Sequence, residues 1–145
     1  MATGLIRRKR FIVALVAAFA LIPLASCESG IRRVPVSGTV TLDGQPLQGG
    51  VLMFNPDESM GNTARVGCSG PVKNGRYSLV TSGVTQIDTG TGAPLGWYKV
   101  TLLTDMPGTP PIKVDPKYLR PETTPLKVEI VEKPEPGRYD LQLTK

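Results

Sequence analysis

The strongest nucleophiles in this sequence are its two cysteines. Cys27 and Cys68 are the only thiols, and no histidine occurs among the 145 residues. A thiolate reacts readily with electrophiles, whereas the lack of histidine removes the usual general base and the commonest zinc ligand. Cys27 directly follows the small residues Ala25 and Ser26. The sequence therefore points first to covalent modification of the Cys27 sulfur.

The segment before Cys27 contains the three parts of a secretory signal. Basic residues occupy 7–10, an apolar stretch of 15 residues covers 11–25, and Pro23 ends any helix within it. This order is typical of a cleaved leader, and the stretch is shorter than the roughly 20 residues of a permanent transmembrane helix. We therefore expect a cleaved, helical signal peptide over residues 1–26.

The run Leu24-Ala25-Ser26-Cys27 resembles the bacterial lipobox. The resemblance implies that the Cys27 thiol is diacylated and that cleavage leaves Cys27 as the first residue of the mature protein. Two or three acyl chains hold a protein stably on a membrane. Two alternatives stay open: an ordinary cleaved signal with a chance cysteine near the cut, and an uncleaved anchor.

The expected localisation is the cell envelope, with the membrane as a partner through lipid on Cys27. Glu28, rather than Asp, follows the cysteine. By resemblance to lipoprotein sorting in some Gram-negative bacteria, this favours the outer membrane over the inner one. Residues 27–33 form a lipidated tether, and its six residues after Cys27 reach at most about 20 Å, so the domain is expected close to the membrane surface.

The charge of the mature chain differs from that of the whole sequence. The chain carries 17 basic and 12 acidic residues, but four of the basic ones lie in the leader, which has no acid. The remaining 13 basic residues nearly balance the 12 acidic ones. Nucleic-acid binding therefore loses its main electrostatic support, and no nucleic-acid partner is expected.

Residues 34–145 show the period-2 alternation of β-strands. Val34, Val36, Gly38, Val40 and Leu42 share one face of the first strand, and Asp43-Gly44 and Asn74-Gly75 are turn signals. In all, seven strands are predicted, at 34–42, 51–54, 63–68, 76–80 and 97–103, around Leu126, Val128 and Ile130, and around Tyr139, Leu141 and Leu143. Seven short strands without a convincing helix predict an all-β, antiparallel, seven-stranded sandwich.

Two long connections interrupt this pattern. Residues 81–96 are rich in Gly and Thr, and residues 105–124 carry five prolines. Loops of this length are unusual unless they are functional or packed on the domain. The proline-rich connection is expected to pack against the edge of the sandwich through Ile112, Val114, Tyr118 and Leu119.

Several runs resemble the carboxypeptidase regulatory-like domain, a prealbumin-like (transthyretin-like) sandwich. They are Val36-Ser37-Gly38-Thr39-Val40, Asp43-Gly44-Gln45-Pro46-Leu47, Gly49-Gly50, Asn74-Gly75-Arg76-Tyr77-Ser78-Leu79 and Gly96-Trp97-Tyr98-Lys99-Val100. The later runs Pro116-Lys117-Tyr118 and Glu122-Thr123-Thr124-Pro125-Leu126 look like small bacterial lipoproteins that carry this domain. The resemblance covers about 34–144 and implies an accessory or adhesive module. A fold does not fix a function.

The sequence gives little support for a catalytic or a metal-binding site. Prealbumin-like enzymes that hydrolyse 5-hydroxyisourate rely on histidines and a C-terminal Tyr-Arg-Gly-Ser signature, and this chain has neither. No base is spaced to activate a Ser or Thr nucleophile, so no enzyme activity and no cofactor are expected. Six loop acids could bind calcium but lack the spaced acidic run of a calcium loop, so no metal site is expected and they are interpreted as solvated. These acids are Asp43, Asp57, Glu58, Asp88, Asp105 and Asp115.

Four side chains have two alternative interpretations each. Cys68 falls on the apolar face of its strand, either as a buried small hydrophobe or as a reactive or intermolecular thiol. Trp97 falls on the outer face, since Tyr98 matches the inward register of Val100, and it either covers the sheet or stacks on a ligand. Outward Val51 and Met53 either form a docking patch or lie under a long loop.

These observations favour a non-catalytic, lipid-anchored envelope protein whose sandwich is a structural or protein-interaction module. The alternative is a module that binds a glycan or a small hydrophobe through Trp97 and the 81–96 loop.

Overall fold

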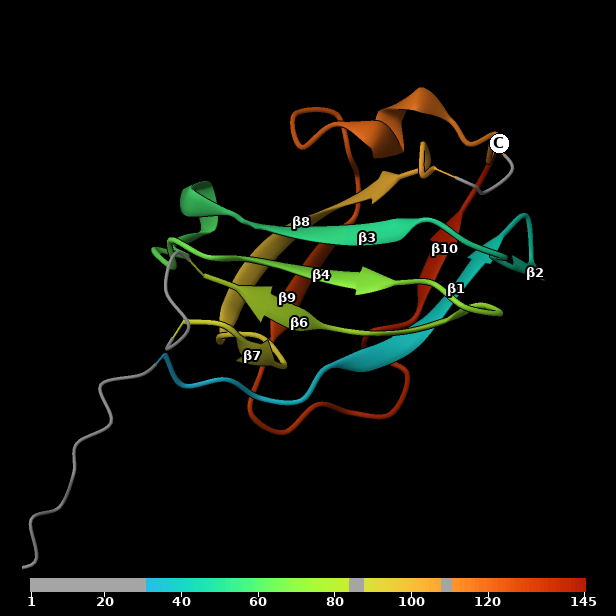
Figure 1. The fold of residues 1–145 in the computed structure, drawn as a ribbon. Coiled ribbons are helices and arrows are strands. Elements are labelled where there is room, and N and C mark those ends of the chain that lie inside the picture. Colours follow the sequence, from blue (N-terminus) through green and yellow to red (C-terminus); the bar gives the residue numbers. More distant parts are fainter. Residues whose placement is uncertain (1–30, 84–87, 108–110) are drawn as a thin grey trace, which may run out of the picture.

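The computed structural model describes residues 31–83, 88–107 and 111–145. These residues form two β-sheets that enclose one apolar core (Figure 1). The chain is mostly β, which confirms the prediction of an all-β sandwich. The expected signal peptide 1–26, including Leu24, Ala25 and Ser26, lies outside the described residues, as does Cys27.

The larger sheet has six antiparallel strands in the order β7-β6-β4-β3-β8-β9. They are β3 (Val51–Pro56), β4 (Gly67–Pro71), β6 (Val80–Ser82), β7 (Gly90–Thr91), β8 (Gly96–Leu103) and β9 (Lys127–Ile130). The alternation predicted for its central strands is confirmed, because Leu52, Phe54, Tyr98 and Val100 point inward and are fully buried. The side chains that alternate with the inward ones along these strands form the outer face of the sheet.

The smaller sheet is built around β1 (Ser37–Leu42). It pairs with β2 (Gln45–Pro46), β5 (Arg76–Ser78) and β10 (Leu141–Leu143). The pairing of β10 with β1 is parallel, so the expectation of a purely antiparallel sandwich is wrong. After β9 the chain crosses from one sheet to the other through residues 131–140, and such a crossover permits a parallel neighbour.

The structure divides the described chain into ten strands rather than seven. The segment predicted as one strand at 76–80 bends at Leu79, with β5 pairing to β1 and β6 to β4. Leu79 itself is fully buried, and its amide donates to the carbonyl of Val36 at 2.9 Å. The strand predicted at 63–68 begins instead at Gly67. The preceding residues 57–64 contain a 3₁₀ turn that is held by side-chain hydrogen bonds.

The two predicted hairpin turns are confirmed. Asp43 and Gly44 have φ of 50° and 78°, and Asn74 and Gly75 have φ of 50° and 70°. Two successive residues with positive φ define the turn that matches the twist of antiparallel strands. A Cβ at Gly75 would also lie 2.7 Å from the Pro46 side chain. Glycine is therefore required here both by the positive φ and by the lack of space for a side chain.

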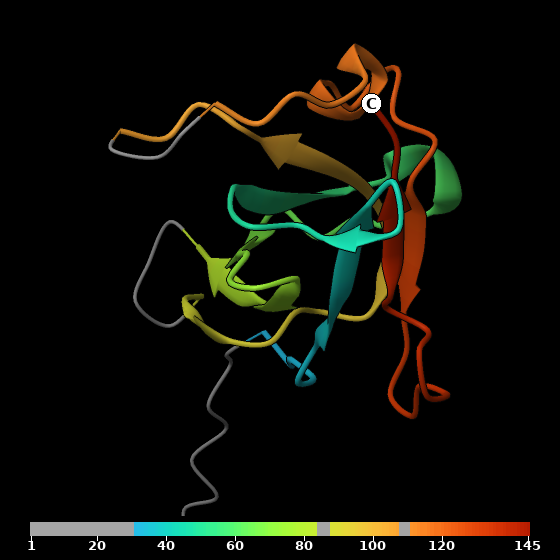
Figure 2. The same cartoon turned by 90° about the vertical axis from the view of Figure 1, so that its right-hand side faces the viewer.

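The proline-rich connection packs on the sandwich, as expected, through Ile112, Val114 and Tyr118. It contains the 3₁₀ helix η2 (Pro116–Leu119), which lies at the top of both views (Figures 1 and 2). The prediction for Leu119 is wrong, since this side chain is 42% exposed. In so short a helix, Tyr118 occupies the inward position and Leu119 points away from the core.

A second 3₁₀ helix, η1 (Glu58–Met60), follows β3. The described chain enters at the end of the sandwich that carries the β3–η1 junction, the start of β8 and the end of β9 (Figure 1). The C-terminus lies at the opposite end, beyond β10. We call these the tether end and the far end.

Candidate functional site

The entry of the chain into the domain is fixed by hydrogen bonds from three consecutive residues. Val34 and Ala93 exchange both of their backbone hydrogen bonds, at 2.9 and 3.0 Å. The guanidinium of Arg33 donates to the carbonyls of Asp88 at 3.3 Å and Thr89 at 3.2 Å. Arg32 forms an ion pair with Glu132. Residues 32–34 are therefore held in place by the loops around them.

Beside this entry, a buried carboxylate lies at the junction of β3 and η1. Asp57 is only 2% exposed, although the sequence predicts a solvated loop acid; this prediction is wrong. The Asp57 carboxylate caps η1, accepting from the Ser59 amide at 3.2 Å and from the Ser59 hydroxyl at 2.5 Å. The Nζ atoms of Lys99 and Lys127 lie 3.7 Å from its two oxygens.

These contacts favour the ionised form of Asp57. The Ser59 hydroxyl, followed by the two ammonium groups, lowers the pKa of the Asp57 carboxyl below its ordinary value of 3.8, although burial opposes the shift. A carboxylate with a lowered pKa is a weak base. Ser59 and Asp57 are therefore poorly suited to act as a nucleophile and its general base.

Asp57 and its two lysine partners lie next to Trp97 on the outer face of the larger sheet. In the strand register, Trp97 is opposite Glu129 of β9, and Lys99 is opposite Lys127. The Glu129 carboxylate pairs with the guanidinium of Arg138 at 2.8 Å. The half-buried Trp97 side chain therefore has charged residues as neighbours in the sheet, a combination that suits polar ligands with an apolar face. We call this arrangement the Trp97 site.

Among the described residues of the 81–96 connection, only the last ones lie near the Trp97 site. Its strand β7 pairs with β6, so β4 and β3 also separate it from β8 in the sheet. Its last residues reach the start of β8, where the Tyr98 hydroxyl donates to the carbonyl of Pro94 at 3.0 Å. The structure thus brings Trp97 together with Asp57, Lys99 and Glu129 more closely than with β7.

The start of β8 makes a close contact with the segment after η1. Gly96 has a φ of 131°, and a Cβ there would lie 3.0 Å from the Asn62 side chain. The buried Asn62 amide donates to the carbonyl of Trp97 at 2.8 Å and accepts from the Ala64 amide at 2.9 Å. The missing side chain at Gly96 therefore allows Asn62 to fasten η1 to β8.

Cys68 is buried on the inner face of β4, which confirms its predicted position. Burial raises the pKa of its thiol, and the Sγ atom lies 3.5 Å from the Thr81 hydroxyl. A buried thiol with a raised pKa is protonated and unreactive at neutral pH.

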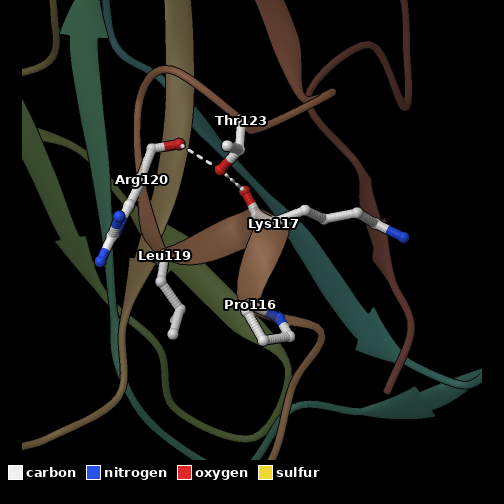
Figure 3. A pocket seen from close by; sticks show the side chains of 5 residues that line it. All are labelled: Pro116, Lys117, Leu119, Arg120 and Thr123. Carbon is white, nitrogen blue, oxygen red and sulfur yellow. Dashed lines mark hydrogen bonds between the residues drawn. The ribbon is translucent and has the colours of Figure 1, made fainter.

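The hollow beside η2 is lined by Pro116, Lys117, Leu119, Arg120 and Thr123 (Figure 3). The Thr123 hydroxyl donates to the carbonyls of Lys117 and Arg120, at 2.9 and 3.5 Å. Figure 3 shows the Lys117 and Arg120 side chains extending in opposite directions, so their charges do not converge. The Nζ of Lys117 instead pairs with Asp115 at 2.9 Å. The hollow therefore lacks a converging set of polar groups.

Within residues 31–83, 88–107 and 111–145, no group of three or more Cys, Asp or Glu side chains is placed to hold a metal ion. The same residues contain no helix with the length and apolar character needed to cross a membrane. Comparison of the chain with protein-family models, curated proteins and solved structures found no match.

Proposed function

We propose that this chain is a lipid-anchored protein of the cell envelope, held on the membrane through Cys27 after removal of residues 1–26. The observation that carries the proposal is the lipobox-like run at the end of a secretory leader, with only six residues between Cys27 and Val34. The fixed entry of Arg32, Arg33 and Val34 into the sandwich supports it, because a short tether that ends in a rigid clamp suits attachment beside a membrane.

Metabolic labelling with a fatty-acid analogue tests this anchoring. The wild-type chain should carry label and remain with the membranes, whereas Cys27→Ser should carry none. Cys68→Ser is the matched control, and it should be labelled as the wild type is, because Cys68 is buried in the core. An unlabelled wild-type protein would refute the proposal.

The anchored domain serves as a non-catalytic structural or protein-interaction module. The outer face of the larger sheet supports this role, because it carries exposed apolar side chains. Val80 and Leu103 are well exposed on this face, and Val51 and Met53 are half-buried there. Exposed apolar groups gathered on one face of a sheet are typical of protein contacts.

Site-specific photocrosslinking in intact cells tests the interaction role. A crosslinker in place of Met53, on the outer face of the larger sheet, should yield a discrete adduct with an envelope protein. The same crosslinker at Thr39, an exposed position on the smaller sheet, should not. Equal adducts from both positions would contradict a specific surface.

The second candidate is a ligand-binding module at the Trp97 site. The half-buried indole with Lys99, Lys127 and Glu129 beside it favours this alternative, because sugars combine an apolar face with hydroxyl groups. Oligosaccharides should then quench the fluorescence of Trp97, the only tryptophan. A flat response across a glycan panel would remove this candidate.

The finer fold assignment is also a proposal. A carboxypeptidase regulatory-like, prealbumin-like sandwich is supported by the positive-φ turns at Asp43-Gly44 and Asn74-Gly75. It is further supported by Tyr77, Tyr98 and Tyr139, which are buried in the core. Placement in the outer membrane rests on Glu28 alone and would be tested by fractionation of the two membranes.

A further inference from the structure

We propose that Met60 and Leu95 form an apolar contact with lipid that seats the tether end of the domain directly on the leaflet. This inference rests on the proposed anchoring through Cys27. It adds the face of the domain that meets the membrane and the side chains that touch it.

Both side chains are large, apolar and exposed. Met60 is 45% exposed and Leu95 is 41% exposed. Each lies beside the same junction, since Leu95 directly precedes Gly96 and Met60 precedes Asn62 by two residues. The Asn62 side chain is 3.0 Å from the position of a Gly96 Cβ, so the two backbone segments are in direct contact. Met60 and Leu95 therefore flank one point of the surface.

That point is close to where the tether enters. Leu95 is two residues from Ala93, which exchanges two backbone hydrogen bonds with Val34. Arg32 and Arg33 are also held by the domain, through Glu132 and the carbonyls of Asp88 and Thr89. Only residues 28–31 remain between the lipid-bearing position and this clamp.

The length of the tether then limits the separation of the domain from the membrane. Four extended residues span about 13 Å. Part of this length crosses the headgroup layer, which is about 5–7 Å thick. The tether end consequently stays within roughly one side-chain length of the bilayer interface, where exposed aliphatic groups are removed from water.

The charges of this end are largely compensated within the domain. Arg32 pairs with Glu132, Arg138 with Glu129, and Asp57 with two lysines, while the exposed Glu58 of η1 adds a fourth acidic group to these four basic ones. Attraction to anionic lipid therefore contributes little, and an apolar contact accounts for the docking. The contact should form equally on zwitterionic and anionic membranes.

The single tryptophan reports on this geometry. Trp97 is two residues from Leu95, at the tether end of β8. The diacylated protein is placed in phosphatidylcholine vesicles that contain a lipid brominated near the headgroup end of its acyl chains. Wild-type Trp97 fluorescence should be quenched, and addition of anionic lipid should leave the quenching unchanged.

The decisive variant is Met60→Ser combined with Leu95→Ser. Its ratio of docked to undocked protein should fall roughly tenfold, because two exposed aliphatic groups no longer leave water. The matched control is Leu103→Ser combined with Leu119→Ser, at positions with 46% and 42% exposure. Leu103 lies about 26 Å along β8 from Leu95, so the control should be quenched as the wild type is.

The outcomes separate this contact from the anchoring itself. Quenching that is absent in a fatty-acid-labelled wild type would refute the contact and leave the anchoring intact. An equal loss of quenching in the Leu103/Leu119 control would show that the domain lies on its sheet face and would also refute it. A protein without label would remove both proposals. All four substituted side chains are exposed, and unchanged melting temperatures would confirm that the variants fold.

Discussion

The two 3₁₀ helices use the same cap and are fastened to the sandwich in opposite ways. Asp57 caps η1 and Asp115 caps η2, each accepting from the backbone amide two residues ahead. Within η1 no side chain is buried, and its attachment comes from the polar groups of Asp57 and Asn62. In η2, Tyr118 is buried in the core. A similar local motif is thus held by electrostatics at the tether end and by apolar packing at the far end.

The two aspartates also differ in how far away their partners are along the sequence. Asp57 meets lysines from β8 and β9, so its charge links three separate segments of the chain. Asp115 meets Lys117, two residues away, and remains partly exposed. Contacts between distant segments are lost together on unfolding, whereas a local pair persists in part in the unfolded chain. The comparison therefore predicts a hierarchy of effects.

The largest effect is expected at the apolar anchor of the far end. Tyr118→Ala removes a buried ring and should lower the free energy of unfolding by about 3–5 kcal/mol. Urea denaturation followed by circular dichroism measures this loss. Tyr118→Phe keeps the ring and removes only a 3.3 Å contact with the Thr144 hydroxyl, so it should be nearly neutral. Similar losses in both variants would show that η2 is held by its polar contacts instead.

A smaller loss is expected at the polar anchor of the tether end. Asn62→Ala removes the hydrogen bonds to the Trp97 carbonyl and the Ala64 amide and leaves buried groups without partners. The free energy of unfolding should fall by about 1–3 kcal/mol. A shift in the emission maximum of Trp97 should accompany it, because the start of β8 is released. Thr63→Ala, at the exposed neighbouring position, is the control. An unchanged stability would show that Asp57 alone fastens η1.

The smallest effect is a difference in acid sensitivity between the two caps. The pKa values of Asp57 and Asp115 are both lowered below 3.8 in the folded state, chiefly by side-chain hydrogen bonds with Ser59 and Lys117 respectively. A lowered folded pKa gives stability that is present above the unfolded value and is lost as the pH falls below about 4. Melting temperatures measured between pH 6 and pH 2 should therefore drop less steeply for Asp57→Asn than for the wild type. Asp115→Asn should change the slope less, and the reverse order would contradict the comparison.

Much of the fold could be predicted from local pattern. The alternation of apolar residues located β1, β3 and β8, and the Asp-Gly and Asn-Gly pairs located two turns, because both signals depend on neighbouring residues. The bend at Leu79 was missed, since a continuous alternating run does not reveal that its two halves pair with different sheets. The parallel pairing of β10 was missed for a related reason: it depends on a crossover between sheets.

The candidate site was predictable only in part. The outward position of Trp97 followed from the register of Tyr98 and Val100, and it is confirmed. The burial of Asp57 was missed, because the lysines that surround it belong to β8 and β9, far away in the sequence. One sequence signal for this site was that Lys99 and Lys127 both occupy outward positions of predicted strands. Such positions can bring charges together once the strands are known to be neighbours.

The parallel pair of β1 and β10 has a consequence for the mechanics of the domain. The chain enters at the start of β1 and leaves after the end of β10, at opposite ends of the sandwich. A pull between the two termini drags these strands past each other along their length. The paired residues Val40–Leu141, Thr41–Gln142 and Leu42–Leu143 are then loaded at the same time. In this geometry the hydrogen bonds resist the force jointly, in shear, instead of opening one after another as a zipper does.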